Sequence, residues 1–209
     1  MIKNDKFVYI HVPRTGGCTV EDLFEERHGL RYTSQHDTVR DLEEKDYTKF
    51  IFGFVRNPYA QEYSCWTLHC VNTDWPPLTF EEWVRLRFDN AIEELKEKYV
   101  VGNKKRREHV DICLEYGTKF CIRGQRDFFQ KGDVILATKI YRFEELKESW
   151  DEISDRIGLD MRFETWPPSD KYKQFYNDYT YDMITKKRCR DLQTFNYTSN
   201  AYSSMGSTK

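Results

Sequence analysis

Two short apolar segments, rich in aromatic and β-branched residues, stand out in the hydrophobic pattern of the chain. They cover residues 7–12 (FVYIHV) and 50–55 (FIFGFV) and carry little charge. Apolar runs of this length without polar alternation are typical of strands buried on both faces, as in a parallel sheet. Pro13 ends the first run, because proline has no N–H to donate to a strand ladder. We therefore predict two buried strands of a parallel sheet.

Helical periodicity covers much of the remaining chain. Thr79 followed by Glu82 is a capping box that opens a helix, and Pro58 suits the first turn of another. Apolar residues recur at helical spacing after these signals. We predict helices over residues 19–29, 58–69, 79–88, 91–99, 144–159 and 179–192, a helical pattern over 104–114, a loop over 121–133, and one or two strands within 134–143.

Strands and helices in this order predict an α/β fold, in which a central parallel sheet is flanked by helices in three layers. The chain of 209 residues is long enough to bury a sizeable core as one domain. We expect that single domain over residues 1–197. The remaining residues, 198–209, are rich in Ser and Thr and are expected to be disordered.

The charge balance argues against a nucleic-acid or membrane-surface partner. The chain has 33 Lys and Arg against 35 Asp and Glu, a net charge of −2, so no global positive field attracts such partners. It has no apolar run long enough to span a membrane, and its first residues, MIKNDK, lack the apolar part of a signal peptide. We expect a cytoplasmic protein; a Golgi-lumenal or secreted domain is the alternative if an anchor has been removed.

The six cysteines are scattered and show no metal-binding spacing. In a cytoplasmic protein such cysteines are reduced thiols. We therefore expect neither a metal site nor a disulfide framework.

The segment after the first apolar run has the composition of an anion-binding loop. Gly16 and Gly17 allow a tight turn and a close approach of the backbone to a bound group, and a helix is expected from Thr19. A strand, a glycine turn and a helix N-terminus in this order direct free N–H groups at an anion, and the helix dipole adds about half a positive charge. Arg14 supplies a full positive charge. The alternative is a strand–turn–helix unit without a ligand.

A second candidate site follows the second apolar run. Arg56 lies at the carboxyl end of the predicted strand, where open α/β sheets place their ligands. Ser64 follows eight residues later, about two turns into the next helix. A guanidinium fork and a hydroxyl group suit a phosphate. The alternative is that Arg56 only caps the strand and Ser64 is an ordinary helix residue.

These two motifs, P-R-T-G-G-C-T over residues 13–19 and V-R-N-P over 55–58 with Ser64, together resemble the nucleotide site of sulfotransferases. Those enzymes use 3′-phosphoadenosine 5′-phosphosulfate (PAPS), and the branch that includes carbohydrate sulfotransferases is the most similar. Weaker similarities follow at residues 125–129 (QRDFF), 141–146 (YRFEEL) and 191–197 (DLQTFNY). The resemblance implies the sulfotransferase form of the P-loop-NTPase-like fold.

The resemblance also implies roles for single residues. The 3′-phosphate would be held by Arg56 and Ser64, and the product would be 3′-phosphoadenosine 5′-phosphate (PAP). Where Arg14 stands, the family usually has Lys, which bonds the bridging oxygen of the leaving group; where Cys18 stands, it has Ser or Thr. The 5′-phosphosulfate would be held by Arg14, Thr15, Gly16, Gly17, Cys18 and Thr19.

Sulfuryl transfer to a hydroxyl acceptor needs a base to remove the acceptor proton. The family resemblance implies a sugar as the acceptor, and a tyrosine side chain, a lipid or a small alcohol are the alternatives. We expect His36 to be this base, because it lies in a polar segment after the first helix and related enzymes use a histidine in a similar place. Asp37 and Glu62 are the alternatives. His11 lies within a strand and is expected to be structural.

Two other functions compete with this interpretation. A small-molecule kinase that uses ATP and Mg²⁺ would share the fold, but the pattern G-x-x-x-x-G-K-[ST] is absent from the chain. A degenerate sulfotransferase that binds PAP or a glycan without catalysis would explain Arg14 and Cys18.

Overall fold

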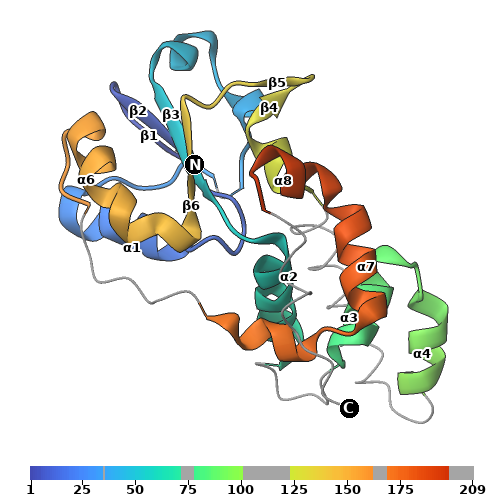
Figure 1. Ribbon diagram of the computed structural model, residues 1–209. Coiled ribbons are helices and arrows are strands. Elements are labelled where there is room, and N and C mark those ends of the chain that lie inside the picture. Colours follow the sequence, from blue (N-terminus) through green and yellow to red (C-terminus); the bar gives the residue numbers. More distant parts are fainter. Residues whose placement is uncertain (35, 72–77, 101–122, 162–168, 198–209) are drawn as a thin grey trace. The chain divides into compact units, whose positions relative to one another are not determined.

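The computed structural model describes residues 1–34, 36–71, 78–100, 123–161 and 169–197. The chain packs as two compact units (Figure 1). The first consists of residues 1–57 and 123–168, and the second of residues 58–122 and 169–209. The expected single domain over residues 1–197 stays a prediction, and the tail 198–209 and the helical pattern at 104–114 lie outside the described residues.

The first unit is built on a four-stranded, mostly parallel sheet. Strands β1 (Ile2–Lys3), β2 (Phe7–Ile10), β3 (Phe50–Val55) and β6 (Lys139–Arg142) lie in this order across the sheet. The pairs β2–β3 and β3–β6 are parallel, and the short edge strand β1 is antiparallel to β2. The predicted α/β class and parallel sheet are therefore confirmed, whereas β1 was not predicted from the sequence.

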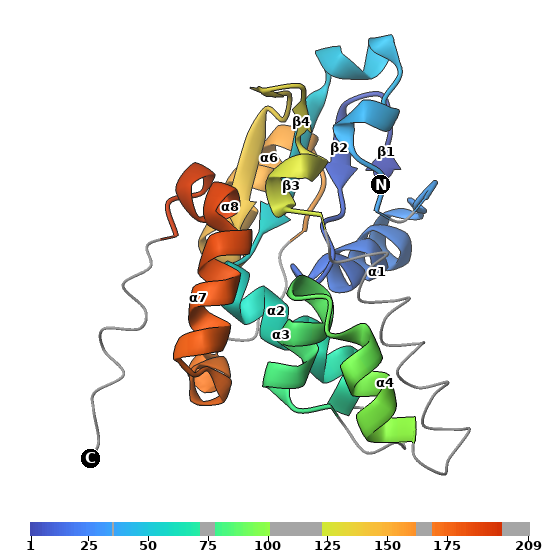
Figure 2. The ribbon, with the colours of Figure 1, turned by 90° about the vertical axis from the view of Figure 1, so that its right-hand side faces the viewer.

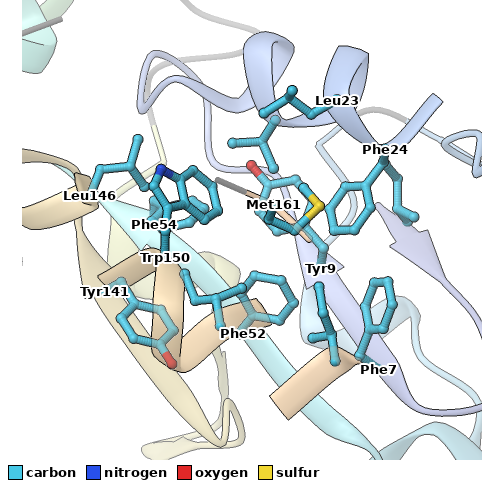
Figure 3. Close-up of a cluster of buried hydrophobic side chains, with 14 residues drawn as sticks. Phe7, Tyr9, Leu23, Phe24, Phe52, Phe54, Tyr141, Leu146, Trp150 and Met161 are labelled. Carbon is cyan, nitrogen blue, oxygen red and sulfur yellow. The ribbon is translucent and has the colours of Figure 1, made fainter. Parts of the chain in front are cut away.

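Large aromatic side chains fill the space between one face of this sheet and two helices, α1 (Gly17–His28) and α6 (Leu146–Ile157). Because the strand period is two, alternate residues of each strand point to this face. Figure 3 shows these residues facing those of the helices. The sheet contributes Phe7, Tyr9, Phe52, Phe54 and Tyr141, and the helices contribute Val20, Leu23, Phe24, Leu146, Trp150, Ile153 and Ile157.

On β3, the central strand of this sheet, a glycine allows a close approach. A Cβ atom on Gly53 would lie 2.5 Å from the carbonyl oxygen of Ile10 and 2.8 Å from the ring of Phe129. Phe129 is fully buried and follows the 3₁₀ helix η4 (Gln125–Phe128). The other small elements of this unit are η1 (Val39–Asp41), η2 (Glu44–Thr48), η5 (Phe143–Glu145) and the antiparallel pair β4 (Gln130–Lys131) and β5 (Val134–Ile135).

The described part of the second unit is helical. Helices α2 (Pro58–Trp66), α3 (Phe80–Phe88) and α7 (Asp178–Lys187) pack against one another, as Figure 2 shows. The other elements are the π-helical turn η3 (Thr67–Val71), α4 (Ile92–Val100), the 3₁₀ helix η6 (Asp170–Phe175) and α8 (Cys189–Thr194). None of the described helices is both long and apolar enough to cross a membrane.

Several predictions differ from these elements. The predicted loop over 121–133 contains η4 and β4, the helix predicted over 58–69 is α-helical only to Trp66, and α6 begins at Leu146 instead of residue 144. Strand β2 ends at Ile10 instead of residue 12, and α1 begins at Gly17 instead of Thr19. The last predicted helix, over 179–192, is divided at Arg188 into α7 and α8. Element ends depend on tertiary contacts that decide the last hydrogen bonds, and elements as short as η4 and β4 leave no periodicity in the sequence.

Candidate functional site

The loop between β2 and α1 has the predicted strand–turn–helix form. Arg14 and Gly16 both have left-handed backbone angles, with φ of 64° and 80°. The hydroxyl of Thr15 is buried and donates a hydrogen bond of 2.9 Å to the carbonyl oxygen of Val12. This bond closes the turn and commits the hydroxyl proton, so the Thr15 side chain has no proton left to donate to a ligand of the loop.

The N-terminus of α1 offers backbone donors to an anion. Gly16 is the N-cap residue and has no side chain to accept from the first N–H groups of the helix. Cys18 and Thr19 lie in the first turn and are exposed. Together with the helix dipole and the Arg14 side chain, this arrangement suits a phosphate or sulfate group.

The thiol of Cys18 stays neutral in this setting. Partial burial of the sulfur raises its pKa, although the residue as a whole is exposed, and the negative charge of Glu21 raises the pKa further, against the opposing effect of Arg14. A neutral thiol adds no negative charge to the loop, so Cys18 does not repel an anion there.

The two glycines of the loop have different roles. Gly16 has the left-handed backbone that the turn requires, and the ring of Phe143 lies against it, 2.6 Å from the position of a Cβ atom. Gly17 is helical, but a Cβ atom there would lie 1.9 Å from the ring of His11. The expectation that both glycines serve the turn is therefore right for Gly16 and wrong for Gly17, which makes room for His11.

His11 lies directly after β2 and not within the strand as predicted, and it is held by a carboxylate partner. Its Nδ1 atom lies 3.0 Å from a carboxylate oxygen of Glu21 on α1, and both side chains are buried. The pair connects the end of β2 to the second turn of the helix. It therefore holds the loop between them from both sides.

His36 lies beside this histidine. Its ring centroid is 4.7 Å from that of His11, and its Nδ1 atom lies 3.4 Å from the His11 carbonyl oxygen. If Nδ1 carries the proton and donates to this carbonyl, Nε2 is the atom that would accept a proton. The alternative base Asp37 accepts a hydrogen bond from the hydroxyl of Ser34 at 2.8 Å.

Arg56 reaches the same loop from the neighbouring parallel strand. Its Nη1 atom donates to the carbonyl oxygen of Arg14 at 3.3 Å, and its guanidinium lies 4.9 Å from the ring centroid of Phe143. The structure thus brings together Arg14, Gly16 and Arg56. Phe143 belongs to the segment 141–146 noted in the sequence, but its contact with both motifs was not predicted.

The remaining two candidates lie in the second unit. Ser64 is buried on α2. Glu62, on the same helix, contacts Arg87 and accepts from the indole N–H of Trp83 at 3.0 Å, and Arg188 lies 3.7 Å from its other oxygen. A carboxylate held in this way is occupied by its partners, which argues against Glu62 as the base.

Metal and disulfide chemistry have no described residues to support them. Within the described ranges, no group of three or more His, Cys, Asp or Glu is suited to a metal ion. Cys18, Cys65, Cys70 and Cys189 are free thiols. The other two cysteines, Cys113 and Cys121, lie outside the described residues.

Comparison of the chain with protein-family models, curated proteins and solved structures gave no match in any of the three. The two motifs and the geometry of the loop are therefore the observations that bear on its function. The motifs and the loop define the class of the protein: it is an α/β protein with a candidate anion site at the carboxyl ends of two parallel strands.

Proposed function

We propose that this protein is a PAPS-dependent sulfotransferase with the P-loop-like fold of that family. The observation that supports it best is the contact between the two motifs. Arg56, from the end of β3, donates to the backbone of the loop that follows the adjacent parallel strand β2. Two cations and a helix N-terminus at one edge of the sheet suit a ligand with separate anionic groups, such as PAPS.

In this proposal the loop binds the 5′-phosphosulfate. Backbone N–H groups at the start of α1 and the Arg14 side chain hold its oxygens, while Arg56 holds the 3′-phosphate. The expected contribution of Ser64 to that phosphate stays a prediction. The acceptor oxygen attacks the sulfur atom in line with the bond to the 5′-phosphate. That S–O bond breaks, its electron pair stays on the phosphate of PAP, and the acceptor proton passes to His36.

Catalysis then depends on positive charge fixed in advance at the leaving phosphate. Arg14 keeps the charge of the usual lysine but spreads it over a planar group with several donors. A sugar hydroxyl is the proposed acceptor, following the family branch that the motifs resemble.

A PAP- or glycan-binding protein without catalysis is the second candidate. It is favoured by the Thr15 hydroxyl, which donates to Val12, and by the neutral Cys18 thiol, since neither is a strong donor for the transferred group. The kinase alternative is less favoured because the chain lacks the G-K-[ST] sequence that binds ATP and Mg²⁺.

Calorimetric titration of the full chain with PAP, ADP and ATP with Mg²⁺ tests the proposal. We expect PAP to bind without metal and more tightly than ADP. Arg56→Ala should weaken PAP binding about 10- to 100-fold, because hydrogen bonds between charged groups contribute about 1.5–3 kcal/mol. Arg31→Ala, which removes a highly exposed arginine paired with Glu25, is the matched control and should bind PAP like wild type.

Each outcome selects one function. Tight PAP binding together with turnover of PAPS supports the sulfotransferase, and PAP binding without turnover on any acceptor favours the binding protein. Tighter binding of ATP with Mg²⁺ than of PAP would contradict the sulfotransferase and favour the kinase. If none of the nucleotides binds, the proposal is wrong.

A further inference from the structure

Gln125 makes an unusual pair of hydrogen bonds with the backbone of Arg56. Its side-chain oxygen accepts from the Arg56 N–H at 2.7 Å, and its side-chain nitrogen donates to the Arg56 carbonyl at 2.7 Å. Gln125 is fully buried at the start of η4. A side-chain amide that satisfies both backbone groups of one residue replaces the neighbouring strand at that position.

This contact lies where the sheet stops supporting the chain. The paired register of β3 with β6 ends at Val55, opposite Arg142. Arg56 is the next residue, and the N–H of Asn57 after it donates to the carboxylate of Glu144 at 2.7 Å. Side chains thus continue the backbone pairing for two residues beyond the ladder. A strand end without such support would be free to change its backbone angles.

The fixed backbone determines where the guanidinium of Arg56 lies. From this position it packs on Phe143 and donates to the Arg14 carbonyl. A long side chain loses much conformational freedom when it binds an anion, and a backbone and rotamer held in advance reduce that loss.

We infer that Gln125 is a positioning residue for Arg56, and that it controls how strongly the site recognises the 3′-phosphate of the nucleotide. The inference rests on the proposed function, since Arg56 is the residue assigned to that phosphate. Gln125 itself does not touch the ligand in this account; it acts through the backbone of Arg56.

A double-mutant cycle on PAP affinity tests this role. Gln125→Met keeps the length of the side chain and removes both hydrogen bonds. We expect it to weaken PAP binding about tenfold in the wild-type background and less than twofold in the Arg56→Ala background. Adenosine 5′-monophosphate, which lacks the 3′-phosphate, should bind Gln125→Met and wild type about equally.

Gln130→Met is the matched control, because Gln130 is also buried in the same unit but donates to Asp127 at 2.8 Å instead of to Arg56. It should leave PAP affinity unchanged. Thermal unfolding followed by circular dichroism reports whether each variant folds. If Gln125→Met does not fold, Gln125→Glu replaces it, since glutamate keeps the acceptor for the Arg56 N–H, loses the donor and adds a negative charge. At least threefold weaker PAP binding is expected, and adenosine 5′-monophosphate binding shows how much of that loss comes from the added charge alone.

Two results would overturn the inference while leaving the proposed function in place. One is the same loss of PAP affinity from Gln125→Met with and without Arg56, which would indicate a general structural role. The other is wild-type affinity in the Gln125 variant that folds. A wild-type protein that does not prefer PAP to adenosine 5′-monophosphate would overturn the proposed function itself, and this role with it, before any variant is made.

Discussion

At the scale of single residues, the loop between β2 and α1 is held by side chains that the sequence motif does not contain. Glu21 pairs with His11, whose ring occupies the space beside Gly17. Phe143 fills the space beside Gly16. Alanine is normally favoured over glycine within a helix by about 1 kcal/mol. At Gly17 the contact with His11 outweighs that preference, because an added methyl group has no room.

The base proposed for catalysis can be tested at the same scale. His36→Ala should lower the turnover number for PAPS and a sugar acceptor about 100-fold or more, since a positioned base contributes about 10²- to 10⁴-fold. Its affinity for PAP should stay at the wild-type value, because His36 has no role in nucleotide binding. Steady-state kinetics and calorimetry measure the two quantities separately.

His28→Ala serves as the control, since His28 lies at the end of α1 and contacts only the carbonyl oxygen of Asp160 among the interactions described. Its turnover should be unchanged. Wild-type turnover of His36→Ala would exclude His36 as the base and direct attention to Asp37.

At the scale of elements, the sequence predicts a helix or strand correctly where residues at both of its ends signal the boundaries. Strand β3 covers the predicted residues, and α3 begins after Thr79, whose hydroxyl accepts from the Glu82 N–H at 3.2 Å. Gly29, with a φ of 64°, ends α1 as expected. Strand β1 was not predicted because two residues carry no periodicity; its pairing with β2 defines it.

Asp46 connects two elements and makes the fold sensitive to acid. It is buried in η2 and accepts bonds from Lys3 of β1 at 2.8 Å and from Lys49 at 2.7 Å. Burial alone would raise the pKa of this carboxyl group, but the two lysines outweigh burial and lower the pKa to about 2. The pKa is lower in the folded protein than the ordinary value of about 3.9. Ionised Asp46 therefore contributes to the free energy of unfolding in full above about pH 4. This contribution is lost as the pH falls from about 4 toward 2.

Asp46→Asn should therefore lower the free energy of unfolding at pH 7 by about 1 kcal/mol, a value reduced by solvent around the two lysines. At pH 2 the difference from wild type should largely disappear. Urea denaturation at the two pH values measures it. Asp170→Asn, the control, removes an exposed carboxylate paired with Lys173. It should leave the free energy of unfolding unchanged at both pH values. A deficit of Asp46→Asn that persists at pH 2 would show that its charge is not the cause.

At the scale of the whole molecule, the chain passes three times between its two units, near residues 57, 122 and 168. Three crossings couple the units covalently, and the single domain stays a prediction that unfolding can test. The second unit contains a buried charge cluster, in which Glu62 lies between Arg87 and Arg188. Removing one charge from such a cluster leaves the other charges buried without full compensation.

Glu62→Gln tests how the units unfold. We expect it to lower the free energy of unfolding by about 3 kcal/mol, because a broken buried ion pair typically costs about 3–5 kcal/mol. If the chain is one domain, the whole unfolding transition shifts to lower temperature as a single step. Differential scanning calorimetry measures the number of transitions. Two transitions, of which only one shifts, would show that the units unfold independently.

The sequence by itself determined the class of fold, most of the elements and the two motifs of the candidate site. These depend on local causes: apolar periodicity, capping residues, glycine and proline, and charged residues placed directly after a strand. Arg14, Gly16 and Arg56 were therefore found without the structure, and parallel pairing of β2 with β3 explains why they meet.

Only the tertiary structure decided what holds these residues in place. Glu21 and Phe143 hold the loop, whereas Gln125 holds the backbone of Arg56. None of the three belongs to the two motifs, and no spacing rule connects Gln125 to Arg56 across 69 positions. Buried polar groups must find hydrogen-bond partners somewhere, but the sequence does not say which ones. The turn at Gly16, the space at Gly17 and the fixed backbone of Arg56 follow from these contacts, and they are what the proposed nucleotide site depends on.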